Sequence, residues 1–180
     1  MNRALIVIDA QNDFITGALA NPNAVKALPT LKNVVEYARG TGFKIFYTMD
    51  THNNDYLETQ EGKNLPVPHC IRYTSGWGID NSVAPHEEDI IIEKFTFGYD
   101  DWADWGWLKD MDEIWIAGFC TDICVVANFM ILKACFPEVP IVVIADACAG
   151  VTQARHDAAI ITMESCQARI IDWEDIAYET

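Results

Sequence analysis

The segment Glu113–Val125 reads EIWIAGFCTDICV, and the fold and function expected of this chain both depend on it. It opens with apolar residues typical of a short buried strand, which is expected to stop at Gly118. A tight turn follows, and capping residue types predict a helix that begins near Thr121–Cys124 and continues through the apolar run Val125–Leu132. The first turn of a helix favours an anion, so Cys124 is a candidate reactive thiol.

The rest of the chain alternates apolar runs of strand length with helical patterns. Helices are expected at Leu31–Arg39 and Gln153–Ser165, and a polar loop without regular structure is expected from Thr51 to Gly78. The further strands expected are Ala4–Ile8, Phe43–Met49, Asp89–Ile92, Val139–Ala145 and a short one at Ala168–Ile171. This alternation predicts a single α/β domain over residues 1–180, a three-layer α-β-α sandwich around a mostly parallel sheet of five to six strands.

Composition narrows the classes of partner. The 180 residues carry a formal net charge of −15, which argues against nucleic-acid and anionic-membrane binding and suits a small neutral or cationic substrate. Met1–Ala10 lacks the features of a signal peptide and no apolar run has the length of a membrane span, so a cytoplasmic protein is expected. The six cysteines form no CxxC pair, which excludes a disulfide framework or a zinc-cysteine site as the expected use.

Polar or ionisable residues follow five of the predicted strands. These residues are Asp9, Asp50, Lys94, Cys124 and Asp146. Because parallel strands end at one edge of a sheet, where ligands bind in such folds, we expect the five side chains to gather there. Asp9 suits a proton acceptor for the thiol and Lys94 a stabilising cation. The spacing equally allows a structural ion pair between Asp9 and Lys94, with Cys124 in the core.

Two histidines and a carboxylate form a second candidate cluster. Asp50 and His52 lie on one side of an extended segment, and His69 returns after the polar loop between two prolines. Such donors suit Zn²⁺, Fe²⁺ or Mn²⁺, and Glu58 or Glu61 offers a further ligand. The alternative is a hydrogen-bonded histidine–aspartate pair in a loop.

The remaining histidines and an aromatic segment have less definite roles. His86 and His156 are expected at the surface. Aromatic residues after Lys94 are expected to line a pocket for a flat ring, to cover a subunit interface, or to pack on the domain itself. They are Phe95, Phe97, Tyr99, Trp102, Trp105 and Trp107.

Several motifs, in order along nearly the whole chain, resemble the isochorismatase-like cysteine hydrolase superfamily, and within it the nicotinamidase/pyrazinamidase branch. They are IVIDAQNDF (6–14), the Asp50-Thr51-His52 strand end, PVPHC (66–70), the lysine after DIIIE (89–93), GFCTDICV (118–125) and VIADAC (143–148). The resemblance implies a cysteine amidohydrolase acting on non-peptide C–N bonds. It favours catalytic roles for Asp9, Lys94 and Cys124 over the structural alternative.

Carried over by motif, Cys124 is the expected nucleophile, Asp9 the general base and acid, and Lys94 the cationic partner. The resemblance also implies a non-proline cis peptide between Phe119 and Cys120. The backbone N–H groups of Cys120 and Cys124 are then expected to form the oxyanion hole.

The resemblance further implies one divalent metal ion, Zn²⁺ first with Fe²⁺ or Mn²⁺ as alternatives, bound by Asp50, His52 and His69. The second histidine of the branch's DWHPxxHxxF pattern is missing here. The fourth ligand is therefore expected to be Glu61, Glu58 or water, or there is no fourth ligand. Phe14 is the expected ring wall of the substrate site.

The expected reaction is hydrolysis of a small nicotinamide-like carboxamide to the acid and ammonia through a cysteine thioester. The expected partners are that small-molecule amide and further copies of the chain, in a dimer or tetramer. The altered loop leaves open a metal-independent amidohydrolase for a carbamoyl or ureido compound, and a catalytically silent binding protein is the third hypothesis. The isochorismatase branch proper often lacks the cysteine and is disfavoured.

Overall fold

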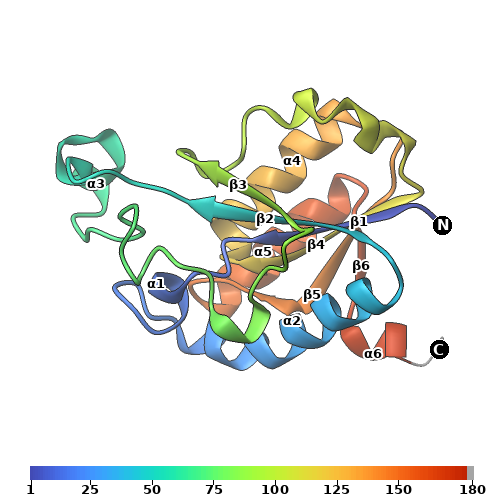
Figure 1. Cartoon of the computed structure of the whole chain (residues 1–180), viewed down its shortest axis with the longest axis horizontal. Coiled ribbons are helices and arrows are strands. Elements are labelled where there is room, and N and C mark those ends of the chain that lie inside the picture. The colour runs from blue at the N-terminus through green and yellow to red at the C-terminus, as the bar shows by residue number, and fades with distance from the viewer. Residues whose placement is uncertain (178–180) are drawn as a thin grey trace.

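A six-stranded sheet forms the centre of the computed structural model, which describes residues 1–177 (Figure 1). The order across the sheet is β3-β2-β1-β4-β5-β6, and every neighbouring pair is parallel. The strands are β1 Arg3–Ile8, β2 Lys44–Asp50, β3 Ile90–Lys94, β4 Glu113–Phe119, β5 Ile141–Ala149 and β6 Arg169–Ile171. The predicted α/β class and parallel sheet are confirmed.

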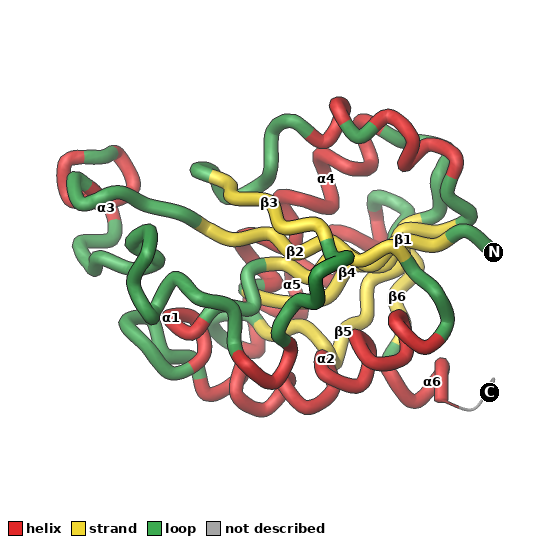
Figure 2. Tube along the Cα trace, viewed as in Figure 1, coloured by secondary structure: helices red, strands yellow, loops and turns green. Residues whose placement is uncertain are grey.

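Helices cover both faces of the sheet (Figures 1 and 2). Helix α2 runs along one face together with α6, whose Trp173 ring meets Tyr37 of α2 at 5.8 Å between centroids. Helices α4 and α5 pack against each other on the opposite face. The helices are α1 Asn12–Ile15, α2 Pro22–Gly40, α3 Gln60–Asn64, α4 Val126–Cys135, α5 Gln153–Ser165 and α6 Trp173–Ala177. No helix within residues 1–177 combines the length and the apolar character that crossing a bilayer requires.

The strand order reverses between β1 and β4, because the chain proceeds from β1 to β2 on one side and from β4 to β5 on the other. In open parallel sheets this reversal opens a crevice at the carboxyl ends of the strands, where ligands bind. Gly118 permits the close pairing there: its φ is +127°, and a Cβ at this position would lie 2.1 Å from the carbonyl oxygen of Ile8. The sheet therefore places the segments after β1 and β4 side by side.

Several predicted boundaries were wrong. Helix α2 begins at Pro22 rather than Leu31, because the Asn21 side chain caps it by accepting the N–H of Asn23 and the helix continues through Pro29. Strand β4 continues past Gly118 to Phe119, and β5 continues to Ala149.

Three short helices lie in regions where none was expected, and the first is α1, directly after β1. The polar loop contains α3, which is capped by Thr59 and preceded by a 3₁₀ turn at Tyr56–Glu58. Helix α6 follows β6 near the end of the described chain.

Candidate active site

Asp9, Lys94 and Cys124 meet at the strand-order reversal, as the sequence predicts. Asp9 follows β1 with a φ of +45°, Lys94 ends β3, and Cys124 lies in the turn after β4. The Lys94 Nζ atom lies 2.7 Å from Asp9 Oδ2 and 3.7 Å from Cys124 Sγ. All three side chains are buried, with Lys94 only 1% exposed. A buried ammonium therefore joins the carboxylate to the thiol.

Burial and pairing set the charges of these groups. Burial alone would lower the pKa of Lys94, but the carboxylate of Asp9 and the neighbouring Cys124 and Asp50 outweigh it and raise that pKa. Burial raises the pKa of Asp9, and the ammonium opposes this effect. Burial also raises the pKa of Cys124 well above its ordinary value, although Lys94 opposes it. The resting arrangement is an ammonium–carboxylate pair beside a neutral thiol.

The predicted cis peptide between Phe119 and Cys120 is confirmed. It is followed by one turn of π-helix, Thr121–Val125, before α4 continues the helix. Such turns are frequent at functional sites. Both Cys120 and Cys124 line the cavity described below.

Two polar side chains to which the sequence analysis gave no role in the site anchor this turn. Asn128 of α4 is fully buried and donates from Nδ2 to the carbonyl of Cys124 at 2.8 Å, while its Oδ1 accepts the indole N–H of Trp102. The His156 ring nitrogen Nδ1 lies 2.8 Å from the hydroxyl of Thr121. His156 is partly buried rather than exposed as expected, whereas His86 is exposed as expected. The sequence signal that could have identified Asn128 is an asparagine within the apolar run Val125–Leu132, four residues after the cysteine.

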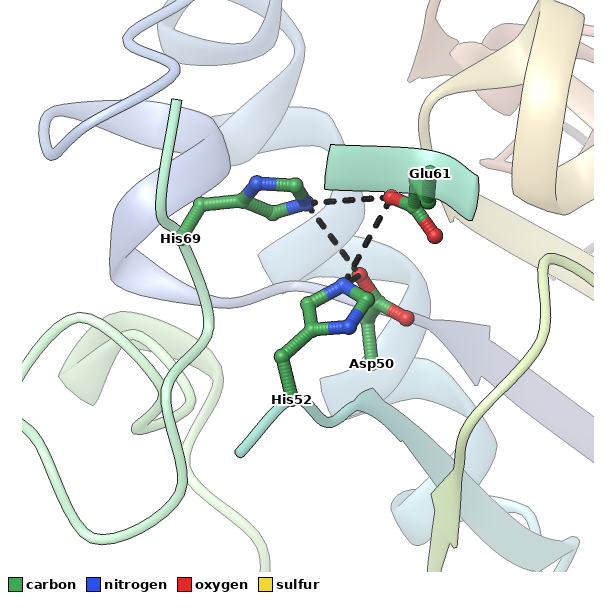
Figure 3. Close-up of side chains that lie close together, drawn as sticks. All are labelled: Asp50, His52, Glu61 and His69. Atoms are coloured by element: carbon green, nitrogen blue, oxygen red, sulfur yellow. Dashed lines mark hydrogen bonds and ion pairs between the residues drawn. The ribbon is translucent and has the colours of Figure 1, made fainter. Parts of the chain in front are cut away.

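Asp50, His52, Glu61 and His69 form the second cluster (Figure 3). Each offers one ligand atom, and the four atoms all lie within 4.8 Å of one another. The Nε2 atoms of His52 and His69 lie 3.2 Å and 3.6 Å from Asp50 Oδ2, and both lie 3.6 Å from an oxygen of Glu61. Two imidazoles and two carboxylates converging on one point fit a divalent transition-metal ion. Glu58 is exposed and lies outside the cluster.

Hydrogen bonds and charges orient the buried residues of this cluster and set the pKa of Asp50. His69 Nδ1 donates to the carbonyl of Val67 at 2.8 Å, which leaves Nε2 directed at the cluster. Burial alone would raise the pKa of Asp50, but hydrogen bonds from His52 and His69 and the charge of Lys94 lower it. Lys94 Nζ also lies 3.4 Å from Asp50 Oδ1, so one ammonium serves both clusters.

The buried ring of Tyr56 packs against both imidazoles of this cluster. Its ring packs edge-on against His52 and His69 at centroid distances of 4.7 Å and 5.1 Å, and its hydroxyl donates to the carbonyl of Leu65. Gly62 allows α3 to pack closely against the backbone of Tyr56, because a Cβ at position 62 would lie 2.0 Å from the carbonyl oxygen of Tyr56. This contact holds the neighbouring Glu61 close to the histidines.

A cavity of about 560 Å³ joins the two clusters. Its apolar walls come from Phe14, Leu19, Leu65, Phe95, Phe97 and Ile123. Phe14, the expected ring wall, therefore lines the cavity and also contacts the His69 ring edge-on at 5.7 Å. The aromatic segment is divided: Phe95 and Phe97 line the cavity, whereas Trp102 is buried behind it.

Asp146 does not join the other strand-end residues. Its carboxylate accepts the N–H of Trp173 at 2.9 Å and lines a separate cavity between α2 and α5. The expectation that all five residues gather at one site was wrong for this one.

A sequence model of the isochorismatase domain matches residues 3–175. The chain belongs to the isochorismatase family. The nicotinamidase of Escherichia coli (strain K12) is 25% identical to it, with 96% of this chain and 97% of that protein covered. A probable inactive nicotinamidase of Arabidopsis thaliana is 28% identical, with 91% and 89% covered. The solved structure of the pyrazinamidase of Pyrococcus horikoshii in complex with zinc has a TM-score of 0.84 at 25% identity, with 96% and 99% covered.

Proposed function

We propose that this protein is a cysteine amidohydrolase that converts a small, neutral, nicotinamide-like carboxamide to the acid and ammonia. The observation that carries the proposal is a cavity lined by Cys124 and by four side chains suited to a metal ion, with the Asp9–Lys94 ion pair buried beside the Cys124 thiol. Similarity to a nicotinamidase and to a pyrazinamidase supports an amide as substrate.

In the first half of the reaction, Asp9 takes the proton of Cys124 as the sulfur attacks the carboxamide carbon. Lys94, 3.7 Å from the sulfur, stabilises the developing thiolate. The backbone N–H groups of Cys120 and Cys124 stabilise the tetrahedral oxyanion. The C–N bond then breaks, Asp9 returns the proton to the leaving nitrogen, and ammonia departs from a thioester.

In the second half, a water molecule gives a proton to Asp9 and its oxygen attacks the thioester carbon. The C–S bond breaks, the acid is released, and the sulfur recovers its proton from Asp9. One water is consumed for each ammonia formed, and Lys94 keeps its proton throughout because the pKa of its ammonium is raised.

Asp50, His52, Glu61 and His69 would hold one divalent ion, with Zn²⁺ as the first candidate and Fe²⁺ or Mn²⁺ as alternatives. When bound, the ion would supply a positive charge and an open coordination position that anchors the ring nitrogen of the substrate, directly or through water. Phe14 and the other apolar walls would enclose the ring.

Charge in the cavity favours a neutral substrate over a carbamoyl amino acid. No lysine or arginine is among the described side chains that line the cavity, and Lys94 is already engaged by Asp9 and Asp50. A carboxylate-bearing substrate would thus lack a cationic side chain to pair with, whereas a neutral pyridine carboxamide requires none.

The altered loop around Glu61 is the observation that favours the second candidate, a metal-independent amidohydrolase for a carbamoyl or ureido compound.

The test is ammonia release from nicotinamide, pyrazinamide and an N-carbamoyl amino acid, with and without added Zn²⁺. We expect nicotinamide hydrolysis to fall by at least about 10³-fold in Cys124→Ala, the loss typical of removing a nucleophile. Cys166→Ala, at a partly buried cysteine outside the cavity, is the matched control and should retain activity.

Three outcomes would contradict parts of the proposal. Full activity of Cys124→Ala refutes the nucleophile assignment. Unchanged kinetics after chelator treatment, with no bound metal, favours the second candidate. Inactivity on every amide, with and without added Zn²⁺, indicates a catalytically silent binding protein.

A further inference from the structure

Gln11, Asn12 and Asp13 follow the proposed base and take no part in the chemistry proposed above. Their side chains are directed at residues 50–78, which include the proposed metal ligands and are called the ligand segment here. Asn12 illustrates the pattern: its Nδ2 donates to the carbonyl of Ser75 at 2.8 Å, and its backbone N–H donates to that of Gly78. The three residues therefore connect the end of β1 to a segment distant in sequence.

Asp13 makes the contact nearest to a ligand. Its Oδ2 accepts the backbone N–H of Cys70, the residue directly after His69, at 2.7 Å. Its Oδ1 accepts the N–H of Ala18 at 2.9 Å, so both carboxylate oxygens are used. Cys70 has a φ of +45°, a conformation that residues with a Cβ adopt only when their surroundings enforce it. The carboxylate thus holds the turn that directs His69 into the cluster.

Two glycines leave room for this carboxylate and for nothing larger. A Cβ at Gly76 would lie 2.3 Å from both carboxylate oxygens of Asp13, and a Cβ at Gly17 would lie 2.3 Å from Oδ1. The backbone N–H of Asp13 donates to the carbonyl of Gly76 at 2.9 Å. The position of the carboxylate is therefore determined from both sides.

Gln11 bonds to both ends of the ligand segment. Its Nε2 donates to the carbonyls of Asp50 and Trp77 at 2.9 Å and 2.8 Å, and its Oε1 accepts the N–H of Asp50 at 2.8 Å. Gln11 is fully buried, and every hydrogen-bonding group of its amide except one lone pair is satisfied. It fixes the backbone of Asp50 from both its N–H and its carbonyl.

We propose that Asp13 is a positioning residue for the proposed metal ligand His69, and that Gln11 is a positioning residue for Asp50. The inference rests on the proposed metal site. Outer partners that orient metal ligands typically contribute 10–100-fold to metal affinity. The bonds of Asp13 reach the proposed ligands through backbone groups, whereas Asp9 is held separately by Thr48 and Lys94. Loss of Asp13 should therefore weaken metal binding and leave the thiol site intact.

The test is the Zn²⁺ affinity of the metal-free protein, measured by competition with a chromophoric chelator. In Asp13→Asn, either orientation of the amide leaves one backbone N–H facing an NH₂ group that cannot accept it. We expect Zn²⁺ binding about 10–100-fold weaker than in the wild type. The rate of Cys124 alkylation by iodoacetamide in the metal-free protein should stay unchanged.

Asp89→Asn is the matched control. Asp89 is also buried and also accepts a backbone N–H, from His86 at 2.8 Å, while pairing with Arg39 away from the cluster. It should lose stability without losing Zn²⁺ affinity. Gly76→Ala is a second perturbation, which keeps the carboxylate but displaces it, and it should weaken Zn²⁺ binding in the same direction.

The outcomes separate this inference from the function on which it rests. Wild-type Zn²⁺ affinity in both Asp13→Asn and Gly76→Ala refutes the positioning role, and so does an equal loss of affinity in Asp89→Asn. Absence of Zn²⁺ binding by the wild-type protein overturns the proposed metal site itself. If Asp13→Asn does not fold, the Gly76→Ala result decides.

Discussion

Replacing Lys94 with methionine is the sharpest test of the charge arrangement at the proposed active site. Methionine has nearly the length of lysine but no charge, so the change removes the ammonium and keeps most of the packing. Lys94 lies against two carboxylates, Asp9 at 2.7 Å and Asp50 at 3.4 Å. The substitution leaves both without their shared cation.

The expected effect on Asp9 follows from the distance. Two unit charges 2.7 Å apart attract by about 6 kcal/mol at an effective dielectric constant of about 20. Losing this attraction raises the pKa of Asp9, in the direction in which burial already shifts it. Asp9 is fully buried, so solvent does not screen the loss. A higher pKa leaves a smaller fraction of Asp9 ionised, and only the ionised carboxylate can accept the proton of Cys124.

We therefore expect Lys94→Met to lower kcat/KM for nicotinamide by about 10²–10⁴-fold at pH 7, the contribution typical of a general base. Its residual activity should rise with increasing pH as Asp9 ionises. Ammonia release measures both effects, and thermal unfolding shows whether the variant is folded. Lys133→Met is the control, because Lys133 is only partly buried and its Nζ donates to the carbonyl of Pro137. Wild-type kcat/KM at pH 7, or residual activity that does not change with pH, would refute the reasoning.

Three further predictions concern stability, metal binding and pH. Gly118→Ala should lower the free energy of unfolding in urea by more than about 3 kcal/mol, because its Cβ meets the backbone of β1 at 2.1 Å; a smaller loss would show that the strands can separate there. Glu61→Gln should weaken Zn²⁺ binding in a chelator competition, whereas Glu58→Gln should not, and the reverse result would exchange their roles. Burial lowers the pKa of His156, although the charges of nearby aspartates oppose this effect. The neutral imidazole therefore contributes stability to the folded protein above the unfolded-state pKa near 6.5, and this contribution is lost as the pH falls below that value. The stability of His156→Gln should accordingly fall less than that of the wild type between pH 7 and pH 5, and parallel pH profiles would contradict this.

The part of the site that lies at strand ends could be predicted from the sequence. Asp9, Lys94 and Cys124 each follow a continuous apolar run, and parallel strands bring such positions to one edge of the sheet. Their separation in sequence carries no information about their separation in space, but the strand pattern does. The distances of 2.7 Å and 3.7 Å that join them are consistent with that logic.

The candidate metal site could be predicted only in part. Asp50 and His52 could be predicted because they lie at a strand end. The choice between Glu58 and Glu61 depends on α3, a helix of five residues that the polar loop sequence does not indicate. Gln11 and Asp13 form hydrogen bonds to backbone groups more than 35 residues away, as Gln11 does with Asp50 across 39 positions. Backbone partners leave no trace in side-chain identity, so no pattern in the sequence reveals them.

Asp146 shows why a strand end is a weaker signal than a strand pairing. Ile116 pairs with Val143, but Gly118 pairs with Cys148, so two steps along β4 correspond to five along β5. The extra residues form a bulge, which changes the direction of the side chains within it. Asp146 lies in that bulge and bonds to Trp173 instead of facing the proposed active site. The apolar run predicts that a strand exists, but only the pairing with a neighbour sets the register, and the register decides which ionisable residues meet.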